Sequence, residues 1–434
     1  MPSDSILAQA IAEQATPLLG AHTDFDLLLD RIGDARFVLI GEATHGTHDF
    51  YRVRAELTKR LIVEKGFRAV AAEADWPDAY RINRFIRGVG RDLDAIGALC
   101  DFRRFPQWMW RNADVLDFVG WLRAHNDRLG EPAERIGFYG LDLYSLRTSM
   151  GAVLQYLDQR DPESAGRARE RYACFDSFGA EPQEYGHAVS LGLAPDCEQE
   201  VLDQLIELLR NRVRLVERDG ILAEDAQFEA EQNARVVARA EEYYRTMYAG
   251  GRSTWNLRDT HMTDTLDALA AHLERRGQPS RIVVWAHNSH VGDSAAMAHR
   301  AERDEITIGH LCRSRHPAET VLIGFTTYDG TVTGASHWGG AAERKTVRPA
   351  LPDSYEALFH ATDMPRFMLM LGELGEATAA LHDPRLQRAI GVVYRPHTER
   401  GSHYFEVRLA EQLDAVIHID QTRALEPLER TALW

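Results

Sequence analysis

The sequence predicts an α/β fold, a mostly parallel sheet flanked by helices, with a large helical insertion capping a cleft. Three observations predict it. Short apolar runs recur along the 434-residue chain, the first two of them enclose a segment with helical spacing, and one long interval has helical patterning without strand-like runs. We interpret residues 1–434 as a single α/β domain, with residues 146–276 as an insertion within it.

The predicted strands are short and almost continuously apolar, as expected of strands that are buried on both faces. They are residues 37–40, 69–72, 136–139, 282–286, 321–326, 367–371, 390–394 and 415–419. Between the first two, residues 50–65 carry Val53, Leu57 and Leu61 at helical spacing, and Gly66 marks the end of the helix. A strand, helix and strand in succession predict parallel pairing.

The interval 146–276 is rich in Glu, Arg, Leu and Ala. Segments 201–209 and 229–248 within it have the spacing of amphipathic helices, so we expect the interval to pack as a cap over the carboxyl edge of the sheet. Residues 329–352 contain Gly and Pro and mix Arg, Lys and Glu. We expect them to form a long loop near the mouth of the site.

The composition limits the partners. The 50 Lys and Arg against 66 Asp and Glu give a net charge of −16, which argues against nucleic acid because such binding relies on basic side chains. No run of about 20 apolar residues is available to cross a bilayer, and the N-terminus lacks the pattern of a signal peptide. Four scattered cysteines without a CxxC motif predict free thiols in a cytoplasmic protein. A small molecule is the expected partner, and the oligomeric state stays open.

The segment 36–48 is the strongest functional signal. An apolar strand runs into a Gly-bounded turn that carries Glu42 and His45. Ligands and catalytic groups collect at the carboxyl ends of parallel strands. Acidic, imidazole or amide side chains also follow the next three predicted strands, namely Glu73, Asp75, Asp142, His287, Asn288 and His290. Because these strand ends share one edge, we expect the side chains to converge on an acid–base site.

The residue types suggest roles at this site. His45 would take a proton from water, with Glu42 and Glu73 orienting the base or the water. Arg54, near the helix start, and His287 would hold or polarise a carbonyl. Structural roles remain open for the same groups: Glu42 could accept turn amide hydrogens, His45 could cap the helix, and Glu73 could pair with an arginine. The aromatic cluster that contains Trp110 fits core packing or a substrate wall.

Missing motifs restrict the chemistry. The chain has no GxSxG, no HExxH, no P-loop and no GxGxxG after a strand, so water or a bound metal must supply the nucleophile. The first hypothesis is hydrolysis by histidine-activated water. The second is a hydrolase that depends on a divalent metal, although no cofactor is firmly predicted, and its ligands would be Glu42, His45, Glu73, His287 and His290. The third is a small-molecule binding protein without turnover.

Six segments resemble one known family. They are Gly-Glu-Ala-Thr-His-Gly-Thr-His (41–48), Glu-Ala-Asp-Trp-Pro-Asp-Ala-Tyr (73–80), Asn-Leu-Arg-Asp-Thr-His-Met (256–262), Trp-Ala-His-Asn-Ser-His (285–290), Glu-Arg-Gly-Ser-His-Tyr-Phe (399–405) and Asp-Ala-Val-Ile-His-Ile-Asp (414–420). In these segments the chain resembles the erythromycin esterase family. The segment 74–80 is similar to the broad chromosomal branch of esterase-like homologues more than to the dedicated macrolide-resistance enzymes.

The resemblance implies an α/β core with a helical portion that encloses a deep cleft. It also implies metal-independent or weakly metal-linked hydrolysis of an ester or lactone by histidine-activated water, with macrolides, and hence antibiotic resistance, as one possible extension. The family's base falls on His45 and its neighbouring acid on Glu42, and further site residues fall on Arg54, Glu73 and His287. For substrate binding we expect four side chains, Arg258, His290, Asp142 and Trp110.

Overall fold

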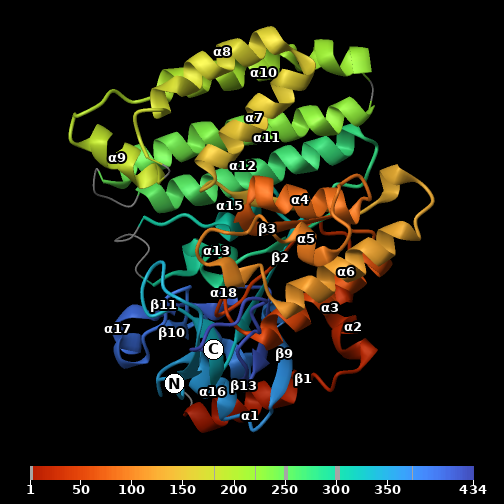
Figure 1. The fold of residues 1–434 in the computed structure, drawn as a ribbon. Coiled ribbons are helices and arrows are strands. Elements are labelled where there is room, and N and C mark those ends of the chain that lie inside the picture. Colours follow the sequence, from red (N-terminus) through yellow and green to blue (C-terminus); the bar gives the residue numbers. More distant parts are fainter. Residues whose placement is uncertain (1–2, 180, 220, 249–252, 299–303, 374) are drawn as a thin grey trace. The chain divides into compact units, whose positions relative to one another are not determined.

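The predicted mostly parallel sheet is present (Figure 1). The computed structural model describes residues 3–434 except 180, 220, 249–252, 299–303 and 374. Eight strands form one sheet in the order β1-β9-β12-β6-β2-β5-β3-β4. Their bounds are β1 Thr16–Pro17, β2 Phe37–Ile40, β3 Ala69–Asp75, β4 Gly137–Asp142, β5 Ile282–Trp285, β6 Thr320–Thr326, β9 Arg366–Met370 and β12 Ala415–Ile419. β2 is parallel to β5 and β6, and β12 is parallel to β6, whereas β9 is antiparallel to β1 and β12.

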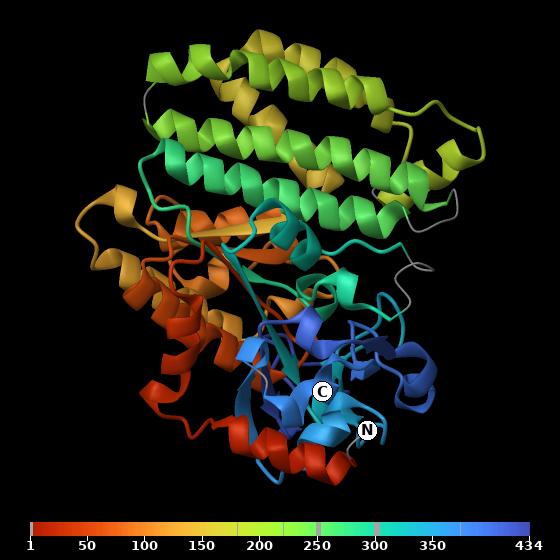
Figure 2. The ribbon, with the colours of Figure 1, turned by 180° about the vertical axis from the view of Figure 1, so that it is seen from behind.

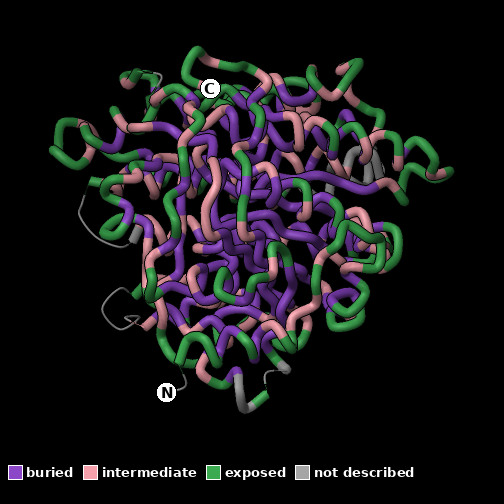
Figure 3. Tube along the Cα trace, turned by 90° about the horizontal axis from the view of Figure 1, so that it is seen from below, coloured by how far each residue is buried: buried purple, intermediate pink, exposed green. Residues whose placement is uncertain are grey.

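Burial explains why these runs are strands. Every residue of β2, β3, β4 and β5 is buried, which is the environment that continuous apolar runs predict. Figure 3 draws the buried residues of the trace in purple. Between β2 and β3 lies helix α3 (His48–Lys65), close to the predicted 50–65. It ends where Gly66 adopts a left-handed conformation with φ of 70°, which a glycine tolerates without a side-chain clash.

Further helices accompany the strands. In chain order they are α1 Asp4–Gln14, α2 Asp26–Ile32, α4 Trp76–Ile86, α5 Ala95–Ala98, α6 Ala113–Asp127, α13 Asn288–Val291, α15 Ile308–Arg315, α16 Tyr355–His360, α17 Glu399–Ser402 and α18 Leu409–Gln412. The start of α6 shows why one of them begins where it does. The side chain of Asn112 accepts a hydrogen bond of 2.9 Å from the Val115 amide, which satisfies a free donor of the first turn.

The interval 146–276 consists of helices joined by short connections, as predicted, and residues 180, 220 and 249–252 lie outside the described residues. Its helices are α7 Leu146–Arg160, α8 Pro162–Tyr172, α9 Pro182–Ser190, α10 Glu198–Asp219, α11 Ile221–Met247 and α12 Ser253–Arg275. α10, α11 and α12 run alongside one another (Figures 1 and 2). On α11, Ala230, Ala234, Val237 and Tyr244 are buried at intervals of three, four or seven residues, the spacing of one helical face.

The chain divides into two compact units. One consists of residues 1–71, 84–137 and 277–434, and the other of residues 72–83 and 138–276. The boundaries fall inside β3 and β4, so Glu73 and Asp142 belong to the second unit. The prediction of one domain over 1–434 and the position of 146–276 as a cap over the cleft both stay predictions.

Two sequence predictions about irregular segments are wrong. Residues 390–394 are not a strand of the sheet, because Ile390 and Val393 make isolated bridges to two different segments, at Thr44 and Ala335. The long loop predicted over 329–352 instead contains strands β7 (Asp329–Gly334) and β8 (Glu343–Val347), which pair antiparallel. β7 also pairs with β13 (Gln421–Thr422), and β10 (Arg385–Arg388) pairs with β11 (Tyr404–Val407). The mostly polar sequences of β7, β8, β10 and β13 hide these strands from an apolar-run criterion.

The prediction of four free thiols is wrong as well. Cys174 and Cys197 form a disulfide with a Cα–Cα separation of 6.0 Å, and Cys100 and Cys312 are free. The two bonded cysteines are 23 residues apart in the chain, so only the packing of the helices brings them together. Among the described residues no helix combines the length and apolarity that a membrane crossing requires. A cytoplasmic location stays a prediction.

Candidate active site

The turn after β2 is held from several sides. A Cβ at Gly41 would lie 2.1 Å from Oδ1 of Asn288, and one at Gly46 would lie 1.8 Å from the carbonyl oxygen of Thr333. Only glycine fits such close approaches. The Asn288 amide donates a hydrogen bond of 2.8 Å to the carbonyl oxygen of Glu42. Contacts of neighbouring segments therefore fix the backbone at Glu42, independently of the contacts that its side chain makes.

The side chains of Glu42 and His45 form a buried pair. Oε1 of Glu42 lies 2.8 Å from Nδ1 of His45, and the two residues are 0% and 7% exposed. A neutral imidazole with its hydrogen on Nδ1 donates to the carboxylate, which leaves the Nε2 lone pair as a proton acceptor. The three-residue spacing seen in the sequence thus produces the orientation that a general base requires.

Arg54 balances the charge of Glu42. Its Nη1 lies 3.1 Å from Oε2 of Glu42, and both side chains are 1% exposed. The guanidinium is also stacked between rings, 4.4 Å from the centroid of Tyr51 and 4.5 Å from that of Trp285. Nε and Nη2 have no hydrogen-bond partner among the described residues. The N–H groups on these two nitrogens can therefore donate hydrogen bonds to an oxygen of a bound molecule or of water.

His287 completes the first group, which we call the His45 cluster (Glu42, His45, Arg54 and His287). Its ring centroid lies 4.7 Å from that of His45, and its Nδ1 lies 2.8 Å from Oγ of Ser289. His287 is the N-cap of α13, and the amide of His290 donates to its carbonyl oxygen at 2.9 Å. The strand ends at Ile40 and Trp285 therefore deliver their imidazoles to one place, as parallel pairing of β2 and β5 predicts.

The second group, the Arg258 cluster, consists of Glu73, Asp142, Tyr144 and Arg258. Nη2 of Arg258 lies 2.7 Å from Oε1 of Glu73 and 2.6 Å from Oδ2 of Asp142, while Nε lies 3.0 Å from Oδ1 of Asp142. The guanidinium carbon lies 5.1 Å from the Tyr144 ring centroid. Glu73 and Asp142 belong to strands β3 and β4, whereas the sequence predicted them to follow these strands. A carboxylate is tolerated in a buried strand here because the guanidinium of Arg258 compensates its charge.

Electrostatics keep Arg258 charged and Tyr144 neutral. Burial opposes the charge of Arg258, but Asp142, Tyr144 and Glu73 outweigh that effect and raise the pKa of the guanidinium well above its ordinary value. Burial likewise raises the pKa of the Tyr144 hydroxyl well above its ordinary value. Tyr144 is therefore a neutral hydroxyl at physiological pH, able to donate a hydrogen bond.

Two further residues were predicted to bind substrate, Trp110 and His290. Trp110 is 5% exposed, with its ring centroid 6.1 Å from that of Phe102, and His290 is buried on α13. Their substrate-binding roles stay predictions. Sequence reasoning missed Tyr51 and Trp285 as partners of Arg54. The first had a readable signal, because residues three apart share a helix face.

Among the described residues no group of three or more His, Cys, Asp or Glu is arranged to hold a metal ion. In the His45 cluster the guanidinium of Arg54 stands 3.1 Å from Glu42, so a permanent positive charge already occupies the place of a cation beside this carboxylate.

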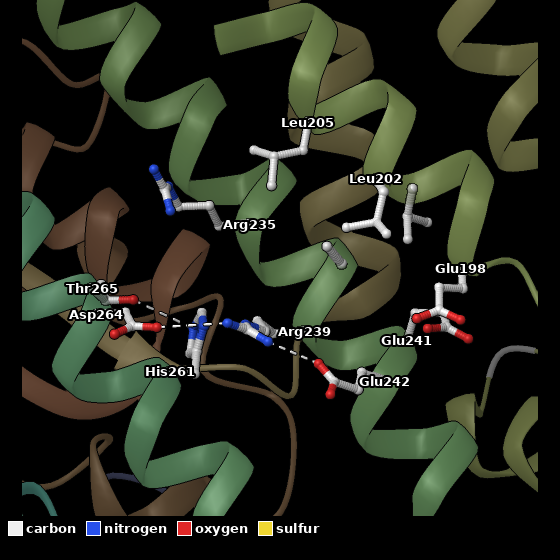
Figure 4. A pocket seen from close by; sticks show the side chains of 12 residues that line it. Glu198, Leu202, Leu205, Arg235, Arg239, Glu241, Glu242, His261, Asp264 and Thr265 are labelled. Atoms are coloured by element: carbon white, nitrogen blue, oxygen red, sulfur yellow. Dashed lines mark hydrogen bonds and ion pairs between the residues drawn. The ribbon is translucent and has the colours of Figure 1, made fainter.

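The second unit contains a cavity of ≈ 200 Å³ between α10, α11 and α12 (Figure 4). Arg239 crosses it, with Nη1 2.9 Å from Glu242 and Nη2 3.6 Å from Asp264. Burial lowers the pKa of His261, which lines the same cavity, to about 3. Its imidazole is thus neutral at physiological pH, and the charge of Arg239 is paired with Glu242 and Asp264.

Known proteins are similar in sequence to this chain over most of its length. The model of the erythromycin esterase family matches residues 62–422. YbfO of Bacillus subtilis (strain 168), whose assigned name is that of a hydrolase, is 21% identical over 94% of this chain and 90% of its own length. Erythromycin esterase type II of Escherichia coli is 23% identical over 71% of this chain and 73% of its own length.

Solved structures share the fold. A succinoglycan biosynthesis protein matches with a TM-score of 0.78 at 22% identity, over 98% of both chains. A mutant of the erythromycin esterase EreC, in its open conformation, matches with a TM-score of 0.64 at 17% identity, over 93% of this chain and 94% of that one. At such identities these similarities establish architecture alone. The family model, in contrast, covers most of the sequence, and so the chain belongs to the erythromycin esterase family.

Proposed function

We propose that the protein hydrolyses carboxylic esters or lactones with water activated by His45. The observation that carries this proposal is the buried pair of Glu42 and His45, 2.8 Å apart, beside the ring of His287. A carboxylate on Nδ1 fixes the tautomer in which Nε2 can take a proton, and it stabilises the imidazolium that results. Membership of a family with an esterase name, and a hydrolase name on one relative, support the same reaction class.

The reaction follows from the positions of the groups. Nε2 of His45 removes a proton from water as the water oxygen attacks the ester carbonyl carbon. The tetrahedral intermediate carries its negative charge on the former carbonyl oxygen, for which Nε and Nη2 of Arg54 or the ring of His287 are candidate donors. The imidazolium then returns its proton to the leaving alkoxide, which gives an acid and an alcohol. A positioned base contributes about 10²–10⁴-fold to such a rate.

The Arg258 cluster is proposed to bind substrate. It presents a guanidinium held by two carboxylates together with the neutral Tyr144 hydroxyl. Such a group suits hydrogen bonding to the hydroxyls and carbonyls of a polyoxygenated molecule. Macrolide lactones are one substrate class of this description, and the name of the Escherichia coli relative includes one of them.

Turnover separates a hydrolase from a binding protein. The full chain, in small amount, is mixed with excess p-nitrophenyl acetate, p-nitrophenyl butyrate or a macrolide lactone. We expect release of many equivalents of p-nitrophenol per protein chain, at a steady rate proportional to protein concentration. For the lactone, mass spectrometry would detect the gain of one water. Release that stops at one equivalent, or saturable binding of all three compounds without any product, would refute hydrolysis.

A further inference from the structure

A second concave site lies in the first unit, away from the contacts of the His45 cluster. It is a cavity of ≈ 560 Å³ lined by parts of α3, β7, β8, β9 and β13. That volume lies within the range of about 300–1,000 Å³ typical of small-molecule sites. Its charged lining consists of Arg52, Arg344, Arg366, Arg423 and Asp49, with His48 beside them. We call it the arginine pocket.

The lining of the arginine pocket carries a net positive charge, whereas the chain as a whole is negative. Four arginines against one aspartate leave a net charge of +3 with histidine neutral, on a protein whose total is −16. Charges more than about 8 Å away are largely screened at physiological ionic strength. A ligand inside the pocket therefore meets mainly the local positive charge.

The one carboxylate is already engaged. Oδ1 of Asp49 lies 2.9 Å from Nη2 of Arg366, and Oδ2 accepts a hydrogen bond of 2.9 Å from the backbone amide of Arg423. The side chain of Arg423 donates to Nε2 of His48, and Nδ1 of the same imidazole lies 2.8 Å from Oδ1 of Asp114, a carboxylate outside the lining. Among the described residues Arg52 and Arg344 are exposed and form no ion pair. The charges of Arg52 and Arg344 are thus available to a ligand, and Arg366 and Arg423 add donors beside them.

Paired strands β7 and β13 line part of the pocket. β13 pairs with β7 at Gly330, where a Cβ would lie 2.0 Å from the carbonyl oxygen of Thr422. Gly330 has a φ of 131°, which L side chains rarely adopt. The amide of Ala424 donates to Oγ1 of Thr331 at 2.9 Å. The four arginines come from α3, β8, β9 and the residue after β13, and they line one hollow.

We propose that the arginine pocket binds a small anion that carries two phosphoryl groups, such as a diphosphate ester. Guanidinium groups bind phosphate oxygens through paired hydrogen bonds. One phosphoryl group carries a charge of about −1.5 to −2 at pH 7, so two of them match the charge of +3, whereas one leaves the pocket positive. The proposal does not depend on ester hydrolysis, because its readout is binding alone.

Calorimetric titration with inorganic pyrophosphate tests the proposal. In metal-free buffer at physiological salt, the full chain should bind one equivalent, and inorganic phosphate should bind more weakly. Arg52→Ala and Arg344→Ala should each weaken pyrophosphate binding by about tenfold or more, which corresponds to about 1.4 kcal/mol. Circular dichroism checks that both variants stay folded, as expected for exposed side chains without ion pairs.

Arg400→Ala is the matched control. Arg400 is exposed and does not line the arginine pocket, so this variant loses the same charge and should bind as the wild type does. Citrate offers carboxylates in place of phosphoryl groups and should bind at least about tenfold more weakly than pyrophosphate. Three outcomes would overturn the proposal: no saturable binding, equal binding of citrate, or an equal loss of affinity in the Arg400 variant.

Discussion

Replacing His45 with alanine is expected to lower the rate of ester hydrolysis by at least about 10²-fold, since a positioned general base supplies about 10²–10⁴-fold. The imidazole contacts Glu42 and the ring of His287 and is largely buried. The variant keeps the glycines and backbone hydrogen bonds that fix the turn, so its circular dichroism spectrum should match that of the wild type. Steady-state rates on a p-nitrophenyl ester measure the effect.

His310→Ala supplies the control for this change. Nδ1 of His310 lies 2.8 Å from Oδ1 of Asp293, so the variant also removes a histidine–carboxylate pair from the same unit. Its rate should stay within about threefold of the wild type, because exposed or partly exposed pairs contribute little. If His45→Ala retained more than a tenth of the wild-type rate, another group would have to be the base.

Replacing Arg54 with methionine is expected to lower the free energy of unfolding by about 3–5 kcal/mol. The guanidinium compensates Glu42 at a site where both side chains are 1% exposed, and its loss leaves a buried carboxylate without its counter-charge. Stacking on Tyr51 and Trp285 is lost too, for which cation–π contacts account for about 0.5–2 kcal/mol. Urea denaturation monitored by circular dichroism measures the change.

Two further variants make this result specific. Arg52 lies two residues before Arg54 on α3 and is exposed. The free energy of unfolding of the Arg52→Met variant should therefore differ from that of the wild type by no more than about 0.5 kcal/mol. Combining Arg54→Met with Glu42→Gln removes the stranded charge and should recover part of the lost stability, as coupled partners do. An Arg54→Met variant as stable as wild type would mean that Glu42 is not held by this ion pair.

The parallel core was predictable because its strands are buried on both faces. β2 matches the prediction residue for residue, and α3 ends at the predicted glycine. A continuous apolar run indicates a strand that is buried on both faces, and the strands of the parallel core are of this kind. β7 and β8 escaped prediction because they are polar strands such as Glu343–Val347, in which only Val347 is fully buried. The run at 390–394 misled for the opposite reason, since its apolar side chains pack without a continuous ladder.

The site was predictable to the extent that it is local in sequence. Glu42 and His45 lie in one turn, so their spacing in the sequence is enough to predict that their side chains pair. The contact of His287 with His45 follows from the pairing of neighbouring strands. No local pattern links Arg258 to Glu73, which is 185 positions away in the chain, or Cys174 to Cys197. Those contacts are products of tertiary packing, and the matched segments pointed to Arg258 without indicating its partners.

The rate of metal-depleted protein tests the central claim, that histidine rather than a metal activates the water. The protein is dialysed against EDTA, its metal content is checked by elemental analysis, and hydrolysis of the same p-nitrophenyl ester is measured. Arg54 already compensates Glu42 at 3.1 Å, so most of the rate should remain after chelation. A rate that vanishes with EDTA and returns with one equivalent of manganese, zinc or cobalt would contradict the claim and make His45 and His287 metal ligands.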